Sequence, residues 1–214
     1  MIGDVTIVDY GLGNLLSVKR GFEHWGIKAT ITSDASAILN SKRIVLPGVG
    51  AFPRAMKLLE EKKLISVIRE FGVSGRSILA ICLGMQLLME NGNEFGSTQG
   101  LGLIAGNVIQ IPNFNQNNER LKVPHIGWNR LNMSDNHTNW KGTLLEDIGP
   151  TDSAYFVHSY MVKLASQKDE ISYASYGDNK ITAAISKGPI HGCQFHPEKS
   201  GEVGLKILRR FCLD

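Results

Sequence analysis

The sequence predicts an α/β protein whose central, mostly parallel sheet is flanked by helices and extended by antiparallel strands in the C-terminal half. In the first half, short apolar runs rich in β-branched residues alternate with segments whose apolar residues recur at helical spacing. These runs are almost continuously apolar, which is typical of strands buried on both faces of a parallel sheet. In the second half, strand-like runs follow one another without intervening helices, which indicates antiparallel pairing.

The first half consists of predicted strands alternating with predicted helices. We expect strands at residues 5–9, 28–32, 43–46 and 77–81, and helices at residues 15–25, 51–64, 65–71 and 83–89. The first strand ends at the glycine turn Gly11-Leu12-Gly13, and Asn14 can cap the helix that follows. The third strand stops at Pro47-Gly48, because both residues interrupt regular structure.

The second half contains six shorter strand-like runs and a closing helix. The runs lie at residues 106–111, 128–131, 154–158, 171–176, 181–185 and 190–195, and the helix at residues 201–211. Polar loops separate them, including the asparagine-rich stretch 113–118 and residues 132–139. We expect these strands to add antiparallel to the sheet. Because no repeat or long linker divides the chain, a single domain spanning residues 1–214 is expected.

Composition excludes several classes of protein. Hydrophobic residues make up 43% of the 214 residues and charged residues 20%, which is ordinary for a globular chain. The net charge of +3 is too small to predict nucleic-acid binding. The longest apolar stretch, residues 78–89, is shorter than the ~20 residues of a membrane-spanning helix. The three cysteines form no CxxC motif, so we expect no disulfide framework, no zinc site and a reducing, cytoplasmic location.

The candidate nucleophile is Cys82. The sequence Ala80-Ile81-Cys82-Leu83-Gly84 places it between small residues, at the junction of a predicted strand and a predicted helix. That layout is a nucleophile elbow, which exposes the side chain at the C-terminal edge of the sheet. The helix N-terminus favours a thiolate, and the N–H of Leu83 points toward a developing oxyanion. The alternative is a cysteine that only fills space, as we expect for Cys193 and Cys212.

The candidate base is His196, within Gln194-Phe195-His196-Pro197-Glu198. A histidine that ends a strand before a proline can project into the cleft above the sheet. Glu198 is close enough to bond the other imidazole nitrogen and hold one tautomer. Alone, this segment also fits a surface histidine beside an exposed glutamate, but together with the elbow it predicts a Cys-His-Glu triad. The other five histidines have no metal-ligand spacing, so we expect no metal and no cofactor.

Two glycine-rich turns offer backbone N–H groups. Gly48-Val49-Gly50 follows the third strand, and beside the elbow it can supply a second oxyanion donor. Gly11-Leu12-Gly13 suggests a dinucleotide site, but Leu16 stands where that motif needs its third glycine. We therefore interpret the first turn only as the connection to a capped helix.

Three motifs occur in the order found in class I glutamine amidotransferases, which the chain resembles. They are Pro47-Gly48-Val49-Gly50-Ala51-Phe52, Ile81-Cys82-Leu83-Gly84-Met85-Gln86 and His196-Pro197-Glu198-Lys199-Ser200. Within that family, the chain looks like the glutaminase subunits of imidazole glycerol phosphate synthases, through residues 8–15, 124–129, 155–160 and 201–211. The similarity runs essentially end to end and implies the class I amidotransferase fold. Ala80 departs from the usual glycine, but alanine is small enough for the turn.

The resemblance implies hydrolysis of L-glutamine to glutamate and ammonia through a cysteine thioester. Cys82 would attack the amide carbon, and His196 would accept the thiol proton and later donate it to the leaving ammonia. Glu198 would orient the imidazole. Gln86, one helical turn after the cysteine, would face the cleft and bind the α-substituents of glutamine. The full set expected to hold the oxyanion and the substrate is Gly48, Val49, Gly50, Leu83, Gln86, His158, Ser159 and Tyr160.

The resemblance also implies a partner, because free ammonia is protonated in water at neutral pH. The family passes ammonia to a (β/α)8-barrel cyclase subunit that makes imidazole glycerol phosphate and AICAR in histidine biosynthesis. We expect this cyclase to be a separate polypeptide in a heterodimer, with no nucleic-acid or membrane partner. His125, Trp128 and Asn129 resemble the segment beside the ammonia exit, and Lys199 resembles an interface lysine.

Two alternatives remain open on the sequence. The same glutaminase chemistry supplies ammonia to sugar amidotransferases in surface polysaccharide biosynthesis, and the glutaminase motifs do not separate the two pathways. A non-catalytic binding member of the fold is the other alternative. The presence of Cys82, His196 and Glu198 together argues against it.

Overall fold

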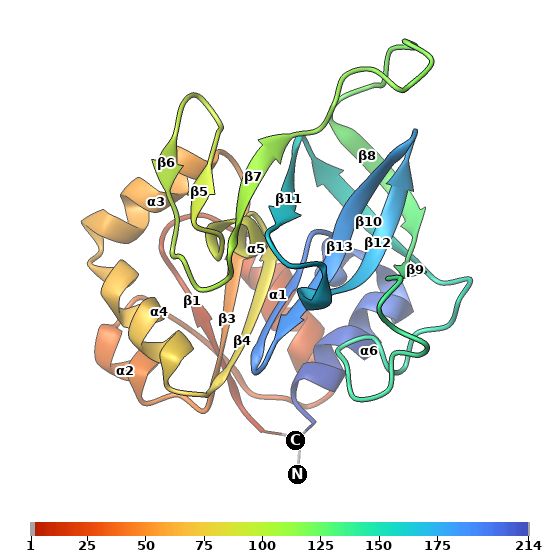
Figure 1. The fold of residues 1–214 in the computed structure, drawn as a ribbon. Helices are drawn as coiled ribbons and strands as arrows, with labels where there is room; N and C mark the ends of the chain where they lie inside the picture. The colour runs from red at the N-terminus through yellow and green to blue at the C-terminus, as the bar shows by residue number, and fades with distance from the viewer. Residues whose placement is uncertain (1–2, 214) are drawn as a thin grey trace.

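An eight-stranded sheet forms the centre of the computed structural model, which describes residues 3–213 (Figure 1). Its strand order is β2-β1-β3-β4-β14-β13-β12-β9. The parallel part consists of β1 (Val5–Val8), β2 (Ala29–Thr32), β3 (Arg43–Gly48), β4 (Ser77–Cys82) and β14 (Ile190–Cys193). The antiparallel part consists of β13 (Asn179–Lys187), β12 (Glu170–Tyr176) and β9 (Asn132–Met133). The predicted fold class is confirmed, although residues 1–2 and 214 of the predicted domain lie outside the described range.

Two smaller sheets accompany the large one. One pairs β8 (His125–Arg130) with β10 (Ser153–His158), and the other contains β11 (Tyr160–Leu164), β7 (Gly106–Gln110), β5 (Asn91–Gly92) and β6 (Thr98–Gln99). The expectation that every second-half strand adds antiparallel to the main sheet was therefore wrong for β7, β8 and β10. Their burial patterns explain the difference, because β8 and β10 alternate between buried and accessible residues and pack through one face only.

The strand predicted at residues 190–195 was also expected to be antiparallel, and it is parallel to β4. A two-residue turn at Gly188-Pro189 joins β13 to β14 as a hairpin, so these two strands are antiparallel. β13 itself runs opposite to the parallel strands, and β14 therefore returns in their direction, beside β4. This position brings the chain after β14 to the edge of the sheet where β4 ends.

Helices cover both faces of the sheet. α1 (Leu15–Glu23) and α6 (Gly201–Phe211) pack on one face. On the other face lie α2 (Ala35–Leu39), α3 (Phe52–Glu61) and α4 (Leu64–Val73), while α5 (Leu83–Leu87) follows β4 directly. Residues 3–213 also contain two single 3₁₀ turns, η1 (Gln167–Asp169) and η2 (Pro197–Lys199). The sequence did not predict α2, whose start is fixed by Asp34 Oδ1 accepting from the N–H of Ala37 at 2.6 Å.

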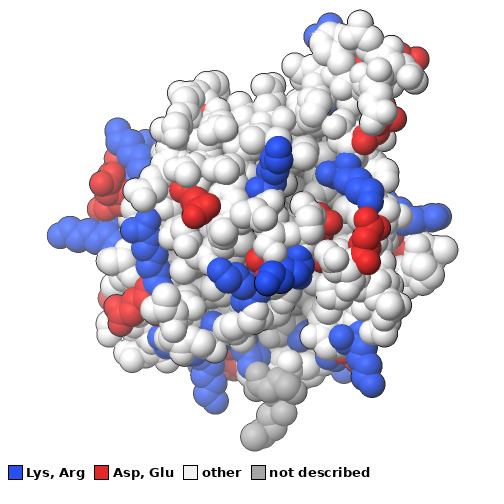
Figure 2. Space-filling model, viewed as in Figure 1, with Lys and Arg blue, Asp and Glu red and all other residues white. Residues whose placement is uncertain are grey.

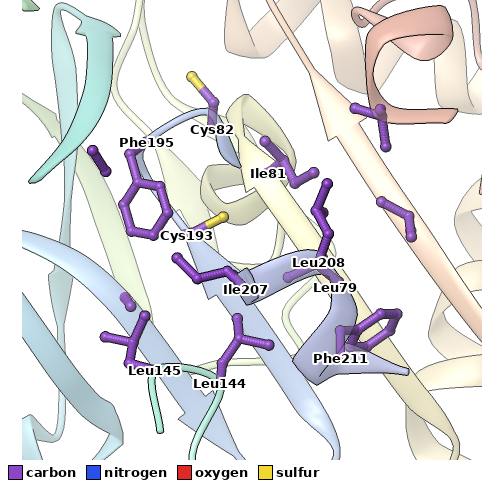
Figure 3. Packing of buried hydrophobic residues seen from close by; sticks show 14 of the residues in the cluster. Leu79, Ile81, Cys82, Leu144, Leu145, Cys193, Phe195, Ile207, Leu208 and Phe211 are labelled. Carbon is purple, nitrogen blue, oxygen red and sulfur yellow. The ribbon is translucent and has the colours of Figure 1, made fainter. Parts of the chain in front are cut away.

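The core consists of two apolar clusters separated by the sheet. Because strand side chains alternate, Leu79 and Ile81 of β4 pack into the cluster beneath α1 and α6, whereas Ile78 and Ala80 pack beneath the opposite helices. Figure 3 shows the first cluster, with Ile207 and Leu208 of α6 packed beside β4. Burial on both faces makes β4 a rigid support for the residue at its end, Cys82.

The surface carries mixed charge. Figure 2 shows Lys and Arg side chains interspersed with Asp and Glu over the face drawn, and the upper rim carries few charged groups. This rim lies at the carboxyl ends of the parallel strands (Figure 1). The segment between β7 and β8, which contains the asparagine-rich loop, projects beyond it (Figure 1). In the part of the chain that the structure describes, no helix is long and apolar enough to cross a membrane.

Candidate active site

A cavity of about 380 Å³ opens at the carboxyl edge of the sheet, where β3 and β4 end. Parallel α/β sheets place their ligand sites at this edge. Its walls come from segments distant in the sequence. The lining residues are Val49, Gly50, Cys82, Leu83, Gln86, Glu94, Pro124, Val157, His158, Ser159, Tyr160 and His196.

Cys82 lies at the turn between β4 and α5, in a conformation that side chains rarely adopt. Its φ is 53° and its ψ is −111°, and it is the N-terminal flanking residue of α5. Such backbone strain costs on the order of 1–3 kcal/mol and clusters at functional sites. The turn also needs Gly84, because a Cβ there would lie 1.9 Å from the carbonyl oxygen of Leu46. The structure therefore contains the predicted elbow, with Ala80 accommodated in the core.

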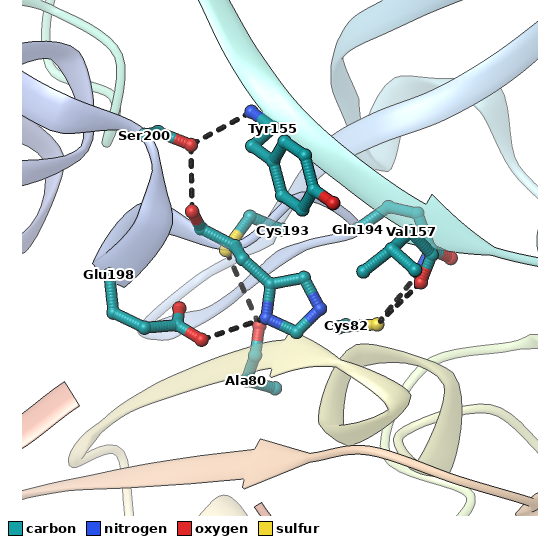
Figure 4. A network of polar contacts seen from close by, with 9 residues as sticks. Ala80, Cys82, Tyr155, Val157, Cys193, Gln194, Glu198 and Ser200 are labelled. Atoms are coloured by element: carbon teal, nitrogen blue, oxygen red, sulfur yellow. Dashed lines mark hydrogen bonds and ion pairs between the residues drawn. The ribbon is translucent and has the colours of Figure 1, made fainter. Parts of the chain in front are cut away.

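The sulfur of Cys82 contacts two groups from other elements. Nε2 of Gln194 donates toward Sγ over 3.6 Å, and Sγ lies 4.0 Å from the carbonyl oxygen of Val157 (Figure 4). Cys82 is 6% exposed and lines the cavity, so a small molecule in the cavity reaches the sulfur. Cys193 instead is completely buried within the sheet and lines no part of this cavity.

His196 and Glu198 form a buried pair at the start of η2. His196 Nδ1 and Glu198 Oε1 are 2.8 Å apart, and their side chains are 2% and 1% exposed (Figure 4). Burial lowers the pKa of His196, but the neighbouring Cys82 sulfur and Glu198 carboxylate outweigh it and raise that pKa to about 10. The buried Nε2 has no hydrogen-bond partner among the described residues. That nitrogen is the one directed away from Glu198, and the residue lines the cavity.

Ser200 fixes the backbone of this pair to the neighbouring sheet. Its Oγ donates to the carbonyl of His196 at 2.7 Å and accepts from the N–H of Tyr155 at 2.9 Å (Figure 4). The N–H of His196 donates to the carbonyl of Tyr155 at 2.9 Å. The two hydrogen bonds to Tyr155 hold η2 against β10, and together with the bond between Ser200 and His196 they set the position of the imidazole.

The glycine loop after β3 lies beside the elbow. The register pairs Gly48 with Cys82, so the loop begins level with the sulfur-bearing residue. A Cβ on Gly48 would lie 2.7 Å from the hydroxyl of Tyr10 and 2.8 Å from the nitrogen of Gly84. Gly50 has a φ of +100°, which glycine adopts at little cost. Only a glycine backbone therefore fits this close to the elbow.

The opposite wall is built around two buried histidines. Nδ1 of His158 donates to the carbonyl of Tyr160 at 2.8 Å, so Nε2 of the neutral ring accepts from Nδ1 of His125 at 3.0 Å. Burial lowers the pKa of each histidine to about 4, so both are neutral at neutral pH. Gln86 joins this wall, because its Nε2 donates to the carbonyl of Tyr160 at 3.0 Å. Its carbonyl oxygen is left to accept from a molecule in the cavity.

The four residues expected at a partner interface do not all reach the surface. Trp128 is 59% exposed, Lys199 is exposed and Asn129 is half-buried. His125 is only 3% exposed, because alternation along β8 turns it inward against Phe156, with ring centroids 5.0 Å apart. Contact between His125 and a partner stays a prediction. In this chain the ring of His125 supports His158 from behind.

The sequence did not indicate a role for Glu94, which lines the cavity, or for Gln194, which lies buried behind Cys82. Glu94 lines the cavity and accepts from the N–H of Phe52 at 2.7 Å, but it stands in a short loop without a recognisable pattern. Gln194 contacts the sulfur of Cys82, and only its place two residues before His196 could have indicated it. Among the residues that the structure describes, no group of three or more metal-ligating side chains is arranged to hold an ion.

The family model for class-I glutamine amidotransferases matches residues 6–214, and the chain belongs to that family. Solved structures agree on the fold: a glutamine amidotransferase has a TM-score of 0.72 at 16% identity, covering 99% of this chain and 100% of the other. PurLQS from Thermotoga maritima has a TM-score of 0.71 at 17% identity, covering 99% and 98%.

Within the family, the chain is a member of the imidazole glycerol phosphate synthase subunit HisH group. It is 43% identical to subunit HisH 1 of Legionella pneumophila (strain Lens), over 98% of this chain and 99% of that protein. It is 45% identical to subunit HisH of Methanosarcina barkeri, over 97% and 96% of the two chains. It is 44% identical to subunit HisH of Lactococcus lactis, over 97% and 96%. The family resemblance recognised in the sequence is confirmed.

Proposed function

We propose that this chain is the glutaminase subunit of an imidazole glycerol phosphate synthase and that Cys82, His196 and Glu198 are its catalytic triad. The observation that carries the assignment is the arrangement at one cavity of a strained elbow cysteine and a histidine bonded to a buried carboxylate. The nucleophile comes from the junction of β4 and α5, and the base and the orienting group come from the η2 segment, so two segments meet at the sheet edge.

In the proposed reaction, Cys82 attacks the side-chain amide carbon of glutamine. His196 holds the thiol proton and delivers it to the departing nitrogen, so that ammonia leaves as the carbon–nitrogen bond breaks and a thioester remains. Water then attacks the thioester carbon while His196 removes its proton, and the carbon–sulfur bond breaks to release glutamate. Glu198 keeps the imidazole in the orientation that both steps need.

The oxyanion of each tetrahedral intermediate is proposed to lie between Leu83 and the loop 48–50. The N–H of Leu83 is the first in α5 and has no partner within the helix, as is general for helix N-termini. Gly48 is level with Cys82, so a main-chain N–H of the loop can supply the second donor. Both donors are main-chain groups, so their geometry depends on the loop conformation.

The substrate's α-ammonium and α-carboxylate are proposed to bind the wall formed by residues 158–160, Gln86 and Glu94. The Glu94 carboxylate lines the cavity and suits an ammonium, and the Gln86 carbonyl oxygen can accept from the same group. Main-chain groups of His158, Ser159 and Tyr160 complete this wall.

The acceptor of ammonia is proposed to be a separate (β/α)8-barrel cyclase that docks over the rim of the cavity. Ile126 and Trp128 are 57% and 59% exposed and, two residues apart on β8, lie on the same face of the strand, so they form an apolar surface together. The ring of Tyr155 lies between Lys199 and Trp128, with Lys199 Nζ 6.0 Å and the Trp128 ring 6.2 Å from its centroid. A cytoplasmic location, expected from the cysteines, stays a prediction.

The same observations give less support to the two alternative functions, a role in polysaccharide biosynthesis and a non-catalytic binding protein. The relatives described above are histidine-pathway subunits over nearly their whole length, which favours that pathway over polysaccharide assembly. A non-catalytic binding protein has no need for a strained cysteine, and relief of that strain would favour glycine at position 82.

Steady-state glutamate release tests the proposal. The wild-type chain, alone and with saturating cyclase and its ligand, is compared with Cys82→Ala under the same conditions. We expect low release from the isolated chain, strong activation by the cyclase and no release from Cys82→Ala. Activation by a sugar amidotransferase partner in place of the cyclase would assign the chain to the other pathway.

A further inference from the structure

Gln194 is a fully buried residue between β14 and η2 that none of the roles above uses. Its exposed fraction is 0%, and its main-chain N–H donates to the carbonyl of Ala183 at 2.9 Å. Among the described residues, its side chain has two hydrogen-bond partners, Nε2 of Gln86 at 3.0 Å and Sγ of Cys82 at 3.6 Å. Both ends of a buried carboxamide are therefore bonded to residues that line the cavity.

The carbonyl of Tyr160 determines which group donates and which accepts in each of these hydrogen bonds. The carbonyl oxygen of Tyr160 can only accept, so the group of Gln86 that faces it at 3.0 Å must be the NH₂. The same nitrogen lies 3.0 Å from Oε1 of Gln194, which must then be the acceptor. The NH₂ of Gln194 consequently faces the sulfur of Cys82.

We propose that Gln194 is a further catalytic residue, whose N–H stabilises negative charge on the sulfur, and that Gln86 is a positioning residue that fixes the orientation of the Gln194 amide. This inference rests on the proposed glutaminase function. Sulfur carries charge twice in that reaction, as the attacking thiolate and as the leaving group when water cleaves the carbon–sulfur bond. A donor held on sulfur lowers the free energy of both charged states.

Of the side chains near the sulfur of Cys82, Gln194 and His196 are the ones that can stabilise negative charge on it. Figure 4 shows Gln194 and Val157 reaching Cys82 from one side, with Glu198 on the other. The Val157 oxygen accepts and cannot stabilise a thiolate. Burial raises the pKa of Cys193, and burial likewise raises that of Tyr10, so both groups stay neutral. Gln194 is the neutral donor that complements the imidazolium of His196.

Three variants test whether Gln194 acts by donating a hydrogen bond to the sulfur or only by filling space in the core. Gln194→Met retains the length of the side chain and removes the donor. Gln194→Glu puts an acceptor against the sulfur. Gln86→Glu leaves Gln194 in place but puts an acceptor against it, which draws the Gln194 NH₂ away from Cys82.

The readout is the rate of alkylation of Cys82 by iodoacetamide between pH 6 and pH 9, assigned by peptide mass, together with glutamate release by the cyclase complex. Alkylation needs no glutamine, so it is independent of any contact of Gln86 with substrate. We expect the midpoint of the rate against pH to move upward in all three variants. Turnover should fall about 10- to 100-fold in Gln194→Met, as loss of a hydrogen bond to a charged group implies. In the alkylation measurement, adding Gln86→Glu to Gln194→Met should change the midpoint little.

The outcomes separate the two proposals. A wild-type Cys82 that is alkylated no faster than Cys193 would overturn the proposed function itself. A reactive wild-type Cys82 with an unchanged midpoint in Gln194→Met would overturn only the role of Gln194. A lower melting temperature in Gln194→Met without a change of midpoint would show that the residue only supports the core, and Gln86→Glu checks the same point without altering Gln194.

Discussion

At the scale of single residues, the site depends on a backbone conformation that the side chain of Cys82 disfavours. A φ of 53° at a non-glycine residue is maintained by the surrounding sheet and by Gly84, which is packed against the carbonyl of Leu46. The strain exposes the sulfur at the cavity while the strand below it stays buried. Function and local stability are therefore in conflict at this position.

Substitution of Cys82 tests this conflict. Cys82→Ala retains a Cβ and therefore the strain, whereas Cys82→Gly removes it. Strain of about 1–3 kcal/mol exceeds the ~0.5–1 kcal/mol that glycine costs through the unfolded chain. We expect Cys82→Gly to melt about 2–4 °C above Cys82→Ala in thermal denaturation. Equal melting temperatures, or a lower one for the glycine variant, would mean that the turn is not strained.

The Glu198 carboxylate sets the charge of His196. Cys82 and Glu198 raise the pKa of His196 to about 10 against the opposing effect of burial. In Glu198→Gln the pKa of His196 should fall, which NMR titration of the imidazole carbon resonances measures. Turnover should fall roughly 100-fold, less than in Cys82→Ala, because the amide still orients the ring without its charge. A Glu198→Gln variant as inactive as Cys82→Ala would contradict an orienting role.

At the scale of elements, the pairing of β8 with β10 encloses two neutral histidines. His125 and His158 each have a pKa lowered to about 4 by burial, against about 6.5 in an unfolded chain. Between these values the unfolded chain binds more protons than the native protein, so stability decreases as pH falls from about 6.5 toward 4. The effect of His196 on stability has the opposite pH dependence, because its pKa is raised in the native protein. Its stabilising contribution is fully present below about pH 6.5 and is lost as the pH rises toward 10.

Urea denaturation at pH 7.5, 6.5, 5.5 and 5.0 measures this acid dependence. We expect the wild-type midpoint to decline between pH 6.5 and 5.0 and the double variant His125→Gln/His158→Gln to decline less. His191 provides the control, since burial also lowers its pKa but it lies in β14, away from the pair. His191→Gln should retain most of the decline. An equal slope in the wild type and the double variant would show that the histidine pair is protonated in the native state.

The sequence predicted the elements with strong periodicity and missed those that depend on tertiary contacts. The parallel strands and the elbow were evident because burial on both faces leaves a continuous apolar run before Cys82. The parallel direction of β14 was not evident, because strand direction follows from pairing with β4 and not from composition. The role of Glu94 and the inward orientation of His125 could not be predicted either, because a single polar residue forms no periodic pattern in the sequence.

At the scale of the whole molecule, the fold gathers its functional groups at one edge. The loops after β3 and β4 and the strand β10 reach the carboxyl edge of the parallel strands, and β8 borders it (Figure 1). Hydrogen bonds to Tyr155 hold the turn η2 against β10 at the same edge. The cavity and the proposed docking surface therefore share a rim. A partner that covers the rim can act on the loop 48–50 directly.

Trp128→Ala tests this docking surface. Loss of a central aromatic anchor typically costs about 2 kcal/mol or more of binding free energy, so affinity for the cyclase should fall about 30-fold or more. Val73→Ala is the matched control, because Val73 is 81% exposed at the end of α4, outside the proposed surface. Titration calorimetry measures both. Equal affinities for the two variants would place the interface elsewhere.

Lys199→Ala addresses communication between the rim and the triad. Lys199 is exposed and adjoins Glu198, so an interface contact there is transmitted through η2 to the imidazole. We expect lower activation by the cyclase with unchanged basal glutamate release. Full activation of the variant would show that docking is sensed through another segment, of which the loop 48–50 is the first candidate.

Covalent trapping by a glutamine analogue with an electrophilic carbon in place of the amide most directly tests the identity of the nucleophile. The protein is treated with the analogue in the presence of the cyclase, and intact mass and peptide mapping locate the adduct. Our account predicts one adduct per chain, on Cys82, with protection by excess glutamine and no adduct in Cys82→Ala. Labelling chiefly at Cys193 or Cys212, or labelling that persists in Cys82→Ala, would contradict it.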